Sequence, residues 1–129
     1  MENVVLEKLK KKDLKIFLIG ATNDKTKYGN TIYRDLKSKN IEVYGINPKA
    51  TTIENDKAYH TIHEPNVKPD ILNFVVPPKI GIEIIRDAIN SGFDNFWLQP
   101  GAESEEIISL LEANKKNYLA HSCVMVQTR

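Results

Sequence analysis

The sequence has 129 residues, with 18 basic and 17 acidic side chains, so its formal net charge at pH 7 is +1. This length fits one domain, which buries about two-thirds of the surface that its unfolded chain exposes. The balanced charge argues against a protein that grips a nucleic-acid backbone, and no stretch is long and apolar enough to cross a membrane.

The first predicted element is an amphipathic, lysine-rich helix over residues 1–12, which ends at a boundary near Asp13. It lacks the continuous apolar stretch of a signal peptide, and its clustered lysines are typical of a solvated helix face. We therefore divide the chain into a helical extension, residues 1–13, and one domain, residues 14–129. The apolar members of the predicted helix are Val4, Val5, Leu6 and Leu9.

Five short apolar runs follow, and most of them stop at glycine, proline or asparagine. Such a run is typical of a strand that is buried on both faces of a parallel sheet. Helical segments separate the runs, and alternating strands and helices with right-handed crossovers predict a doubly wound parallel sheet. The predicted strands are residues 16–19, 41–46, 71–76, 96–98 and 118–120.

The clearest helix begins at Pro78, where a missing N–H costs nothing, and closes at Ser91 and Gly92. A weaker helix is predicted over residues 28–39, and another one follows with Glu103 and two further glutamates in its first turn. Residues 51–68 are polar and irregular, and we expect a long connection there with a short strand around residues 58–62. The predicted fold class is α/β: a Rossmann-like, three-layer α/β/α domain with about five strands and an extra N-terminal helix.

Ligands of such a sheet bind outside the carboxyl ends of its strands, so the residues that end each strand are the candidates. After the first strand, Gly20 leaves a sharp turn without a side chain, and Thr22 and Asn23 supply hydroxyl and amide groups. Gly29 lets the next helix begin close to this loop, where its backbone N–H groups would face an anion. The loop matches neither the full dinucleotide fingerprint nor a P-loop, so an ordinary turn explains it as well as a phosphate cradle does.

The end of the second strand discriminates better between ligands. A nicotinamide dinucleotide enzyme usually has a carboxylate there for the ribose hydroxyls, whereas this chain has Asn47, Pro48 and Lys49. An amide and a lysine favour a ribose that carries a phosphate, as in NADP or in the 3′-phospho-adenosine of coenzyme A. A plain turn with an exposed lysine is the alternative.

From about Leu14 onward the sequence resembles the small stand-alone coenzyme A-binding proteins, whose domain is similar to the nucleotide-binding amino-terminal domain of the succinyl-CoA synthetase alpha subunit. The resemblance is carried by short motifs at the strand ends. They are Ile-Gly-Ala-Thr at 19–22, Lys-Tyr-Gly at 27–29, Ile-Asn-Pro at 46–48, Val-Val-Pro-Pro at 75–78 and Trp-Leu-Gln-Pro-Gly at 97–101.

This resemblance implies how coenzyme A would lie. Residues 20–23 would line the pyrophosphate, residues 47–49 would surround the 3′-phospho-ribose, and Val76 with Pro77 would cover the adenine. The full set of implied cofactor-binding residues is Gly20, Ala21, Thr22, Asn23, Lys27, Tyr28, Gly29, Asn47, Pro48, Lys49, Val76, Pro77, Pro78 and Gln99.

The only cysteine, Cys123, lies in a terminal segment that resembles the closing cysteine motif of this family. It is either a reactive thiol near the thiol end of coenzyme A, with His121 as an activating neighbour, or a small packed hydrophobic residue. A single cysteine cannot form an intrachain disulfide, which favours a reducing compartment, so we expect a cytoplasmic protein. His60 and His63 match no zinc-binding spacing, and no metal site is predicted.

We interpret the chain as a non-catalytic protein that binds coenzyme A or acyl-CoA through the 3′-phospho-ADP moiety. No nucleophile elbow or pair of carboxylates is present to serve as catalytic residues. Two alternatives remain: an NADP-binding regulator, or a component that acts on a CoA thioester with a partner chain. The expected partner is a small nucleotide ligand rather than nucleic acid or a membrane, and the number of chains is open, with a homodimer as one option.

Overall fold

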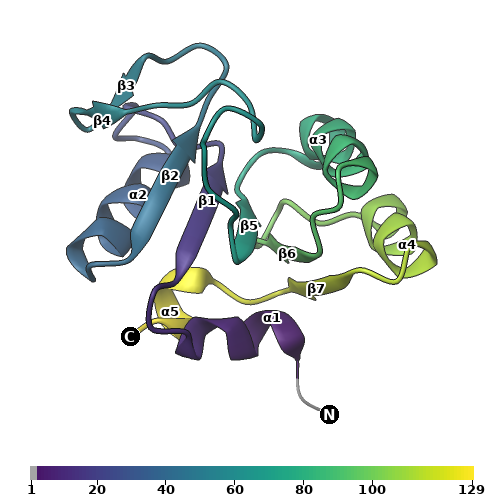
Figure 1. Cartoon of the computed structure of the whole chain (residues 1–129). Coiled ribbons are helices and arrows are strands. Elements are labelled where there is room, and N and C mark those ends of the chain that lie inside the picture. The colour runs from purple at the N-terminus through teal and green to yellow at the C-terminus, as the bar shows by residue number, and fades with distance from the viewer. Residues whose placement is uncertain (1–2) are drawn as a thin grey trace.

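Five parallel strands form the centre of the structure (Figure 1). The computed structural model describes residues 3–129. The order of the strands across the sheet reverses at the first one, which pairs with the second strand on one side and with the third main strand on the other. The strands are β1 (Lys15–Ile19), β2 (Glu42–Ile46), β5 (Ile71–Phe74), β6 (Asn95–Leu98) and β7 (Asn117–Ala120), in the order β2-β1-β5-β6-β7. The predicted doubly wound α/β fold is confirmed.

Helices cover both faces of the sheet, and each face has its own apolar core. In β1, Ile16 and Leu18 face one core while Phe17 and Ile19 face the other, which is why the whole strand is apolar. No helix within residues 3–129 has the length and apolarity to cross a membrane. One face carries α1 (Val4–Glu7), the 3-10 helix η1 (Lys8–Lys10), α2 (Tyr28–Ser38) and α5 (Val124–Gln127), and the other carries α3 (Pro78–Asn90) and α4 (Glu105–Ala113).

The helix starts follow the signals in the sequence, with one correction. Pro78 occupies the first turn of α3. The hydroxyl of Ser104 caps α4 by accepting the N–H of Ile107 at 3.1 Å. Glu103, predicted for the first turn of α4, lies before the cap instead, and its carboxylate accepts the N–H of Gly101 at 3.0 Å.

The N-terminal helix is shorter than predicted and partly of the 3-10 type. Met1 and Glu2, where the predicted helix begins, lie outside the described residues. Val5 is fully buried in the core, whereas Val4 is 47% exposed, so its assignment to the apolar face is wrong. The reason is that only one side of this short turn meets the sheet, where Asn3 also donates to the carbonyl of Tyr118 at 2.9 Å.

The connection between β2 and β5 contains a small antiparallel hairpin in place of the strand predicted at 58–62. It consists of β3 (Thr52–Ile53) and β4 (Asp56–Lys57), joined by Glu54 and Asn55. Both turn residues have positive φ, 48° and 69°, as a tight two-residue hairpin requires. The expected strand is reduced to a single bridge between Tyr59 and Ile46.

Candidate functional site

A pocket of about 570 Å³ opens at the carboxyl ends of β1, β2 and β5, where the strand order reverses. Ligands of open α/β sheets bind at this kind of place. The loops after these three strands form part of its wall, and residues 60–62 and α3 complete it. The predicted residues that line it are Gly20, Thr22, Lys27, Asn47, Pro48, Lys49, Val76 and Pro77.

Gly20 brings the three strand ends together. Its φ is +106°, and a Cβ there would lie 2.8 Å from Val75 and 2.9 Å from Val76. Its N–H donates to the carbonyl of Ile46 at 3.1 Å, and the N–H of Ala21 donates to Leu18 at 3.4 Å. These two N–H groups are therefore used within the protein, and Gly20 contributes close packing rather than a free donor.

Helix α2 begins against this loop because Gly29 has no side chain. A Cβ on Gly29 would lie only 2.0 Å from the carbonyl oxygen of Gly20. Lys27 is the N-cap residue, and no side-chain hydrogen bond caps the helix. The positive end of the α2 dipole is thus held beside Thr22 and Lys27, where it favours a negative charge.

Asn47 fixes the turn that carries Lys49. Its amide donates to the carbonyl of Ala21 at 3.0 Å, which ties the loop after β2 to the loop after β1. Its carbonyl oxygen accepts the N–H of Lys49 at 2.8 Å, the bond of an Asx-turn. The carboxamide is engaged at both ends, so Asn47 positions the pocket while Lys49 supplies the charge.

The pocket has one cationic part and one apolar wall. Within residues 3–129, Lys27 and Lys49 form no ion pair with a carboxylate, and both line the pocket. At the rim each acidic side chain has a histidine partner, because Asp87 contacts His63 at 2.8 Å and Glu64 contacts His60 at 3.2 Å. The apolar wall consists of Ile19, Ile46, Ile62, Val75, Val76, Pro77, Ile80 and Ile84.

Other predicted residues do not line the pocket, because packing directs their side chains elsewhere. Both ends of the Asn23 carboxamide bond the hairpin, to the carbonyl of Thr52 and the N–H of Glu54, each at 2.8 Å. Tyr28 is 73% exposed on the first turn of α2. Ala21 and Gly29 are buried behind the loop, and Pro78 starts α3.

Gln99 is also separate from the pocket. Its side chain is 4% exposed, and its carbonyl oxygen accepts the N–H of Val124 at 2.8 Å. Its amide donates to the sulfur of Cys123 at 3.3 Å. Gln99 therefore anchors the C-terminal segment to the sheet. Cys123 is half-buried and does not line the pocket, and exposed His121 lies 3.6 Å from Glu103.

The wall formed by α3 and residues 60–62 was not among the predicted site residues. Ile80 and Ile84 of α3 line the pocket, and Ile80 is 54% exposed there. Their spacing of four residues places them on one side of α3, and the unusual width of its apolar face was the available signal. Within residues 3–129, no cluster of three histidine, cysteine or acidic residues could hold a metal ion.

Known proteins share this architecture. Residues 14–129 match the model of a family described as a CoA binding domain. A solved structure described as a conserved hypothetical protein from Pyrococcus furiosus is 44% identical, with a TM-score of 0.86. The match covers 89% of this chain and 99% of that chain.

Larger enzymes contain a similar segment. The ADP-forming acetate–CoA ligase II subunit alpha of Pyrococcus furiosus is 24% identical in an alignment of 120 residues, and the match covers 84% of this chain and 26% of the relative. A dinucleotide-forming acetyl-coenzyme A synthetase of Ca. Korarchaeum cryptofilum, solved with phosphate and ADP, is 27% identical, with a TM-score of 0.73. That match covers 88% of this chain and 26% of the synthetase. The chain thus spans about a quarter of the length of the curated relative that it matches.

Proposed function

Because this chain belongs to the family of CoA-binding domains, we propose that its pocket at the strand ends binds coenzyme A or an acyl-CoA. The proposal rests on two lysines, Lys27 and Lys49, that have no carboxylate partner within residues 3–129 and lie next to an apolar wall where the strand order reverses. The phosphate groups of coenzyme A would bind to the two lysines, and its purine base would pack against the apolar wall.

The parts of the ligand can be assigned to parts of the pocket. The pyrophosphate would lie at the start of α2, beside Thr22 and Lys27, where the helix dipole favours an anion. The 3′-phosphate would contact Lys49, whose turn is held by Asn47. The adenine would pack against Val76 and the exposed side chain of Ile80.

We also propose that the chain binds its ligand without catalysing a reaction. Two groups in the pocket that could transfer a proton are His60 and Asp87, and each contacts a side chain at the rim, Glu64 and His63 respectively. The thiol of Cys123 lies outside the pocket, against Gln99. The site therefore offers recognition of phosphates and a base, and this favours a binding module.

Thermal unfolding tests the proposal with three ligands. Coenzyme A should raise the Tm more than dephospho-coenzyme A or NADP does, because ligand binding stabilises the folded state by mass action. Equal shifts in Tm from coenzyme A and dephospho-coenzyme A would mean that the pocket does not recognise the 3′-phosphate. If millimolar coenzyme A gives no shift, the binding function itself is wrong.

Lys49→Gln tests the residue that we assign to the 3′-phosphate. The variant should lose about 1.5–3 kcal/mol of binding free energy for coenzyme A and little for dephospho-coenzyme A, since a charge-assisted contact is removed. Lys115→Gln is the matched control, because Lys115 is exposed, forms no ion pair within residues 3–129 and lies after α4, outside the pocket. Titration calorimetry measures both variants, and identical behaviour would make Lys49 an ordinary surface residue.

A second candidate function is a CoA-binding component that acts with a partner chain. It is favoured by the relative named subunit alpha of an ADP-forming ligase, of which this chain spans 26%. Tagged protein recovered from its native cells would then carry a second chain at a fixed stoichiometry. Recovery of the chain alone, with coenzyme A bound, favours the stand-alone module.

A further inference from the structure

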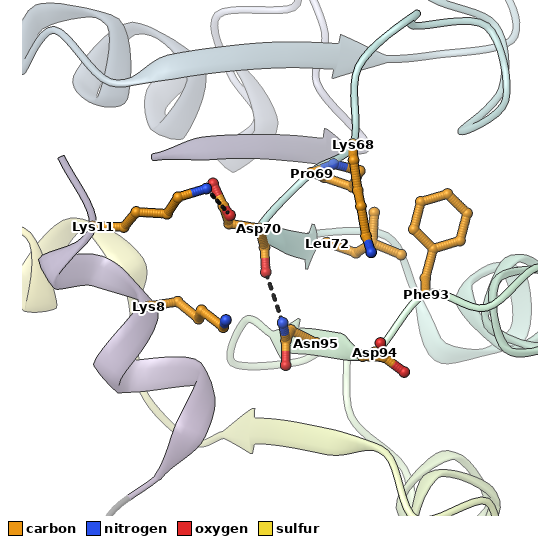
Figure 2. Close-up of a pocket in the computed structure, with 9 residues that line it drawn as sticks. All are labelled: Lys8, Lys11, Lys68, Pro69, Asp70, Leu72, Phe93, Asp94 and Asn95. Carbon is orange, nitrogen blue, oxygen red and sulfur yellow. Dashed lines mark hydrogen bonds and ion pairs between the residues drawn. The ribbon is translucent and has the colours of Figure 1, made fainter. Parts of the chain in front are cut away.

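We call the pocket at the carboxyl ends of β1, β2 and β5 the strand-end pocket. A second pocket lies at the opposite end of the sheet. It has a volume of about 300 Å³ and opens beside the amino ends of β5 and β6 (Figure 2). We name it the basal pocket, and its lining residues are Lys8, Lys11, Lys68, Pro69, Asp70, Leu72, Phe93, Asp94 and Asn95.

The acidic side chains of the basal pocket are already neutralised by other lysines. Asp70 contacts the ammonium group of Lys11 at 2.7 Å and accepts the N–H of Lys15 at 2.8 Å, so both of its oxygens are occupied. Asp94 pairs with Lys116 at 2.9 Å. Both carboxylates of the pocket thus already have a lysine partner.

Two lysines remain without a carboxylate partner in the described part of the chain. Lys8 is half-buried on η1, and Lys68 lies on the segment that leads into β5. Both residues line the pocket, and Figure 2 shows Lys68 beside Leu72 and Phe93 at its apolar end and Lys8 on the other side, near Asn95. Two ammonium groups that line one pocket next to an apolar surface favour a small anion that has an organic part.

We propose that the basal pocket binds the oxyanion group of a small phosphorylated or carboxylated molecule, with Lys8 and Lys68 as its cationic groups. The site is independent of the proposed CoA site, which lies at the other ends of the strands. Lys8 and Lys11 also precede residues 14–129, the part that matches the family model. The N-terminal segment thus adds a wall that the matched domain does not supply.

Residue-resolved NMR titration of the full chain tests this proposal. Inorganic phosphate and acetate are added separately at constant ionic strength, with chloride replaced, and backbone amide shifts are followed. We expect saturable shifts at Asp70, Phe93 and Asn95 with at least one of the two anions, and the stronger binder identifies the oxyanion class. Shifts equal to those caused by chloride alone would overturn the proposal.

The double variant Lys8→Gln, Lys68→Gln identifies the groups responsible. It should bind the anion about tenfold more weakly or worse, because two charge-assisted contacts are lost. Lys12→Gln is the matched control, since Lys12 lies on the same segment, is exposed and does not line the basal pocket. Circular dichroism verifies that each variant is folded, and a folded double variant with unchanged affinity would contradict the proposal.

Discussion

Gly29 shows how one missing side chain sets the distance between a helix and a binding loop. Alanine there would place its Cβ 2.0 Å from the carbonyl oxygen of Gly20, which is backbone and cannot move aside cheaply. Gly29→Ala should therefore reduce the free energy of unfolding by about 1–3 kcal/mol, despite the higher helix propensity of alanine. Urea unfolding measures this change.

Gly81 provides the matched control for Gly29. It also lies in a helix, α3, but a Cβ there would meet its nearest neighbour, Val76, at an ordinary 3.4 Å. Gly81→Ala should raise the free energy of unfolding by about 0.5–1 kcal/mol through helix propensity alone. The opposite signs of the two substitutions are the critical result, and equal effects would contradict the close approach at Gly29.

Tyr33 should control part of the response of stability to alkaline pH. Its burial, together with the hydrogen bond from its hydroxyl to the carboxylate of Asp56 at 2.7 Å, raises the pKa of Tyr33 above its usual value of 10.0. The folded state thus favours the neutral phenol. The stability that Tyr33 contributes is complete below about pH 10 and is lost as the pH rises toward the folded-state pKa.

Tyr33→Phe separates these effects. At pH 7 the variant should lose about 1 kcal/mol of stability with the hydrogen bond, since Asp56 keeps an ion pair with Lys37 at 3.4 Å. Above about pH 10 its stability should decline less steeply than that of the wild type. Unfolding curves at several pH values measure both, and parallel declines would exclude Tyr33 as the cause.

At the residue scale, the sequence predicts positions better than side-chain directions. Strand ends can be located because apolar runs stop at Gly20, Asn47 and Pro77, and parallel topology brings these ends to one edge. The directions of Asn23 and Gln99 depend on tertiary partners, the hairpin and Val124, which local sequence does not indicate. Asn23 and Gln99 both carry polar groups suited to a ligand, yet these groups form hydrogen bonds within the protein.

At the scale of elements, Asn30 fixes the hairpin β3–β4 to the loop after β1. Its side chain is fully buried, and its amide donates to the carbonyl of Thr22 and to the carboxylate of Glu54, each at 2.9 Å. Its carbonyl oxygen accepts a bond from Arg34 at 2.7 Å. We therefore expect the hairpin to keep the loop after β1 in a binding conformation.

Asn30→Ala tests this connection. The variant should lose about 1–3 kcal/mol of stability, because the bonds of a fully buried carboxamide to its partly buried partners are lost, and it should bind coenzyme A more weakly. Asn114→Ala is the control, since Asn114 is exposed at the C-cap of α4 and its side chain donates to the carbonyl of Leu110, far from the loop after β1. Urea unfolding measures the stability of both variants, and calorimetry measures their affinity for coenzyme A. If Asn30→Ala binds coenzyme A as tightly as the wild type does, the hairpin does not hold the loop for binding.

The hairpin could not be predicted from the sequence for a specific reason. Its turn places Glu54 and Asn55 at positive φ, a conformation usually signalled by glycine, and glutamate gives no such signal. Each of its strands has only two residues, too few for an alternating pattern to be recognised. The five main strands, by contrast, are longer and apolar, so they could be recognised. They lie within about two residues of their predicted bounds.

At the scale of the whole molecule, the N-terminal segment is part of the core. Val5 is fully buried with the side chains of the α2 face, whereas the adjacent Val4 is 47% exposed. Val5→Ala should reduce the free energy of unfolding by about 2 kcal/mol, and Val4→Ala should change it by less than about 0.5 kcal/mol. Thermal and urea unfolding compare the two, and equal losses would mean that the helix docks differently.

The order of strands also has a kinetic consequence. Pairing of β1 with β5 joins Ile16 to Ile71 and closes a long loop that contains β2, α2 and the hairpin. The β5–β6–β7 half has shorter crossovers, so its contacts cost less chain entropy to form. The strand-end pocket exists only after the two halves have joined. A nucleotide held across this joint would therefore act mainly on the rate at which the halves separate, and would extend the lifetime of the folded chain more than it speeds folding.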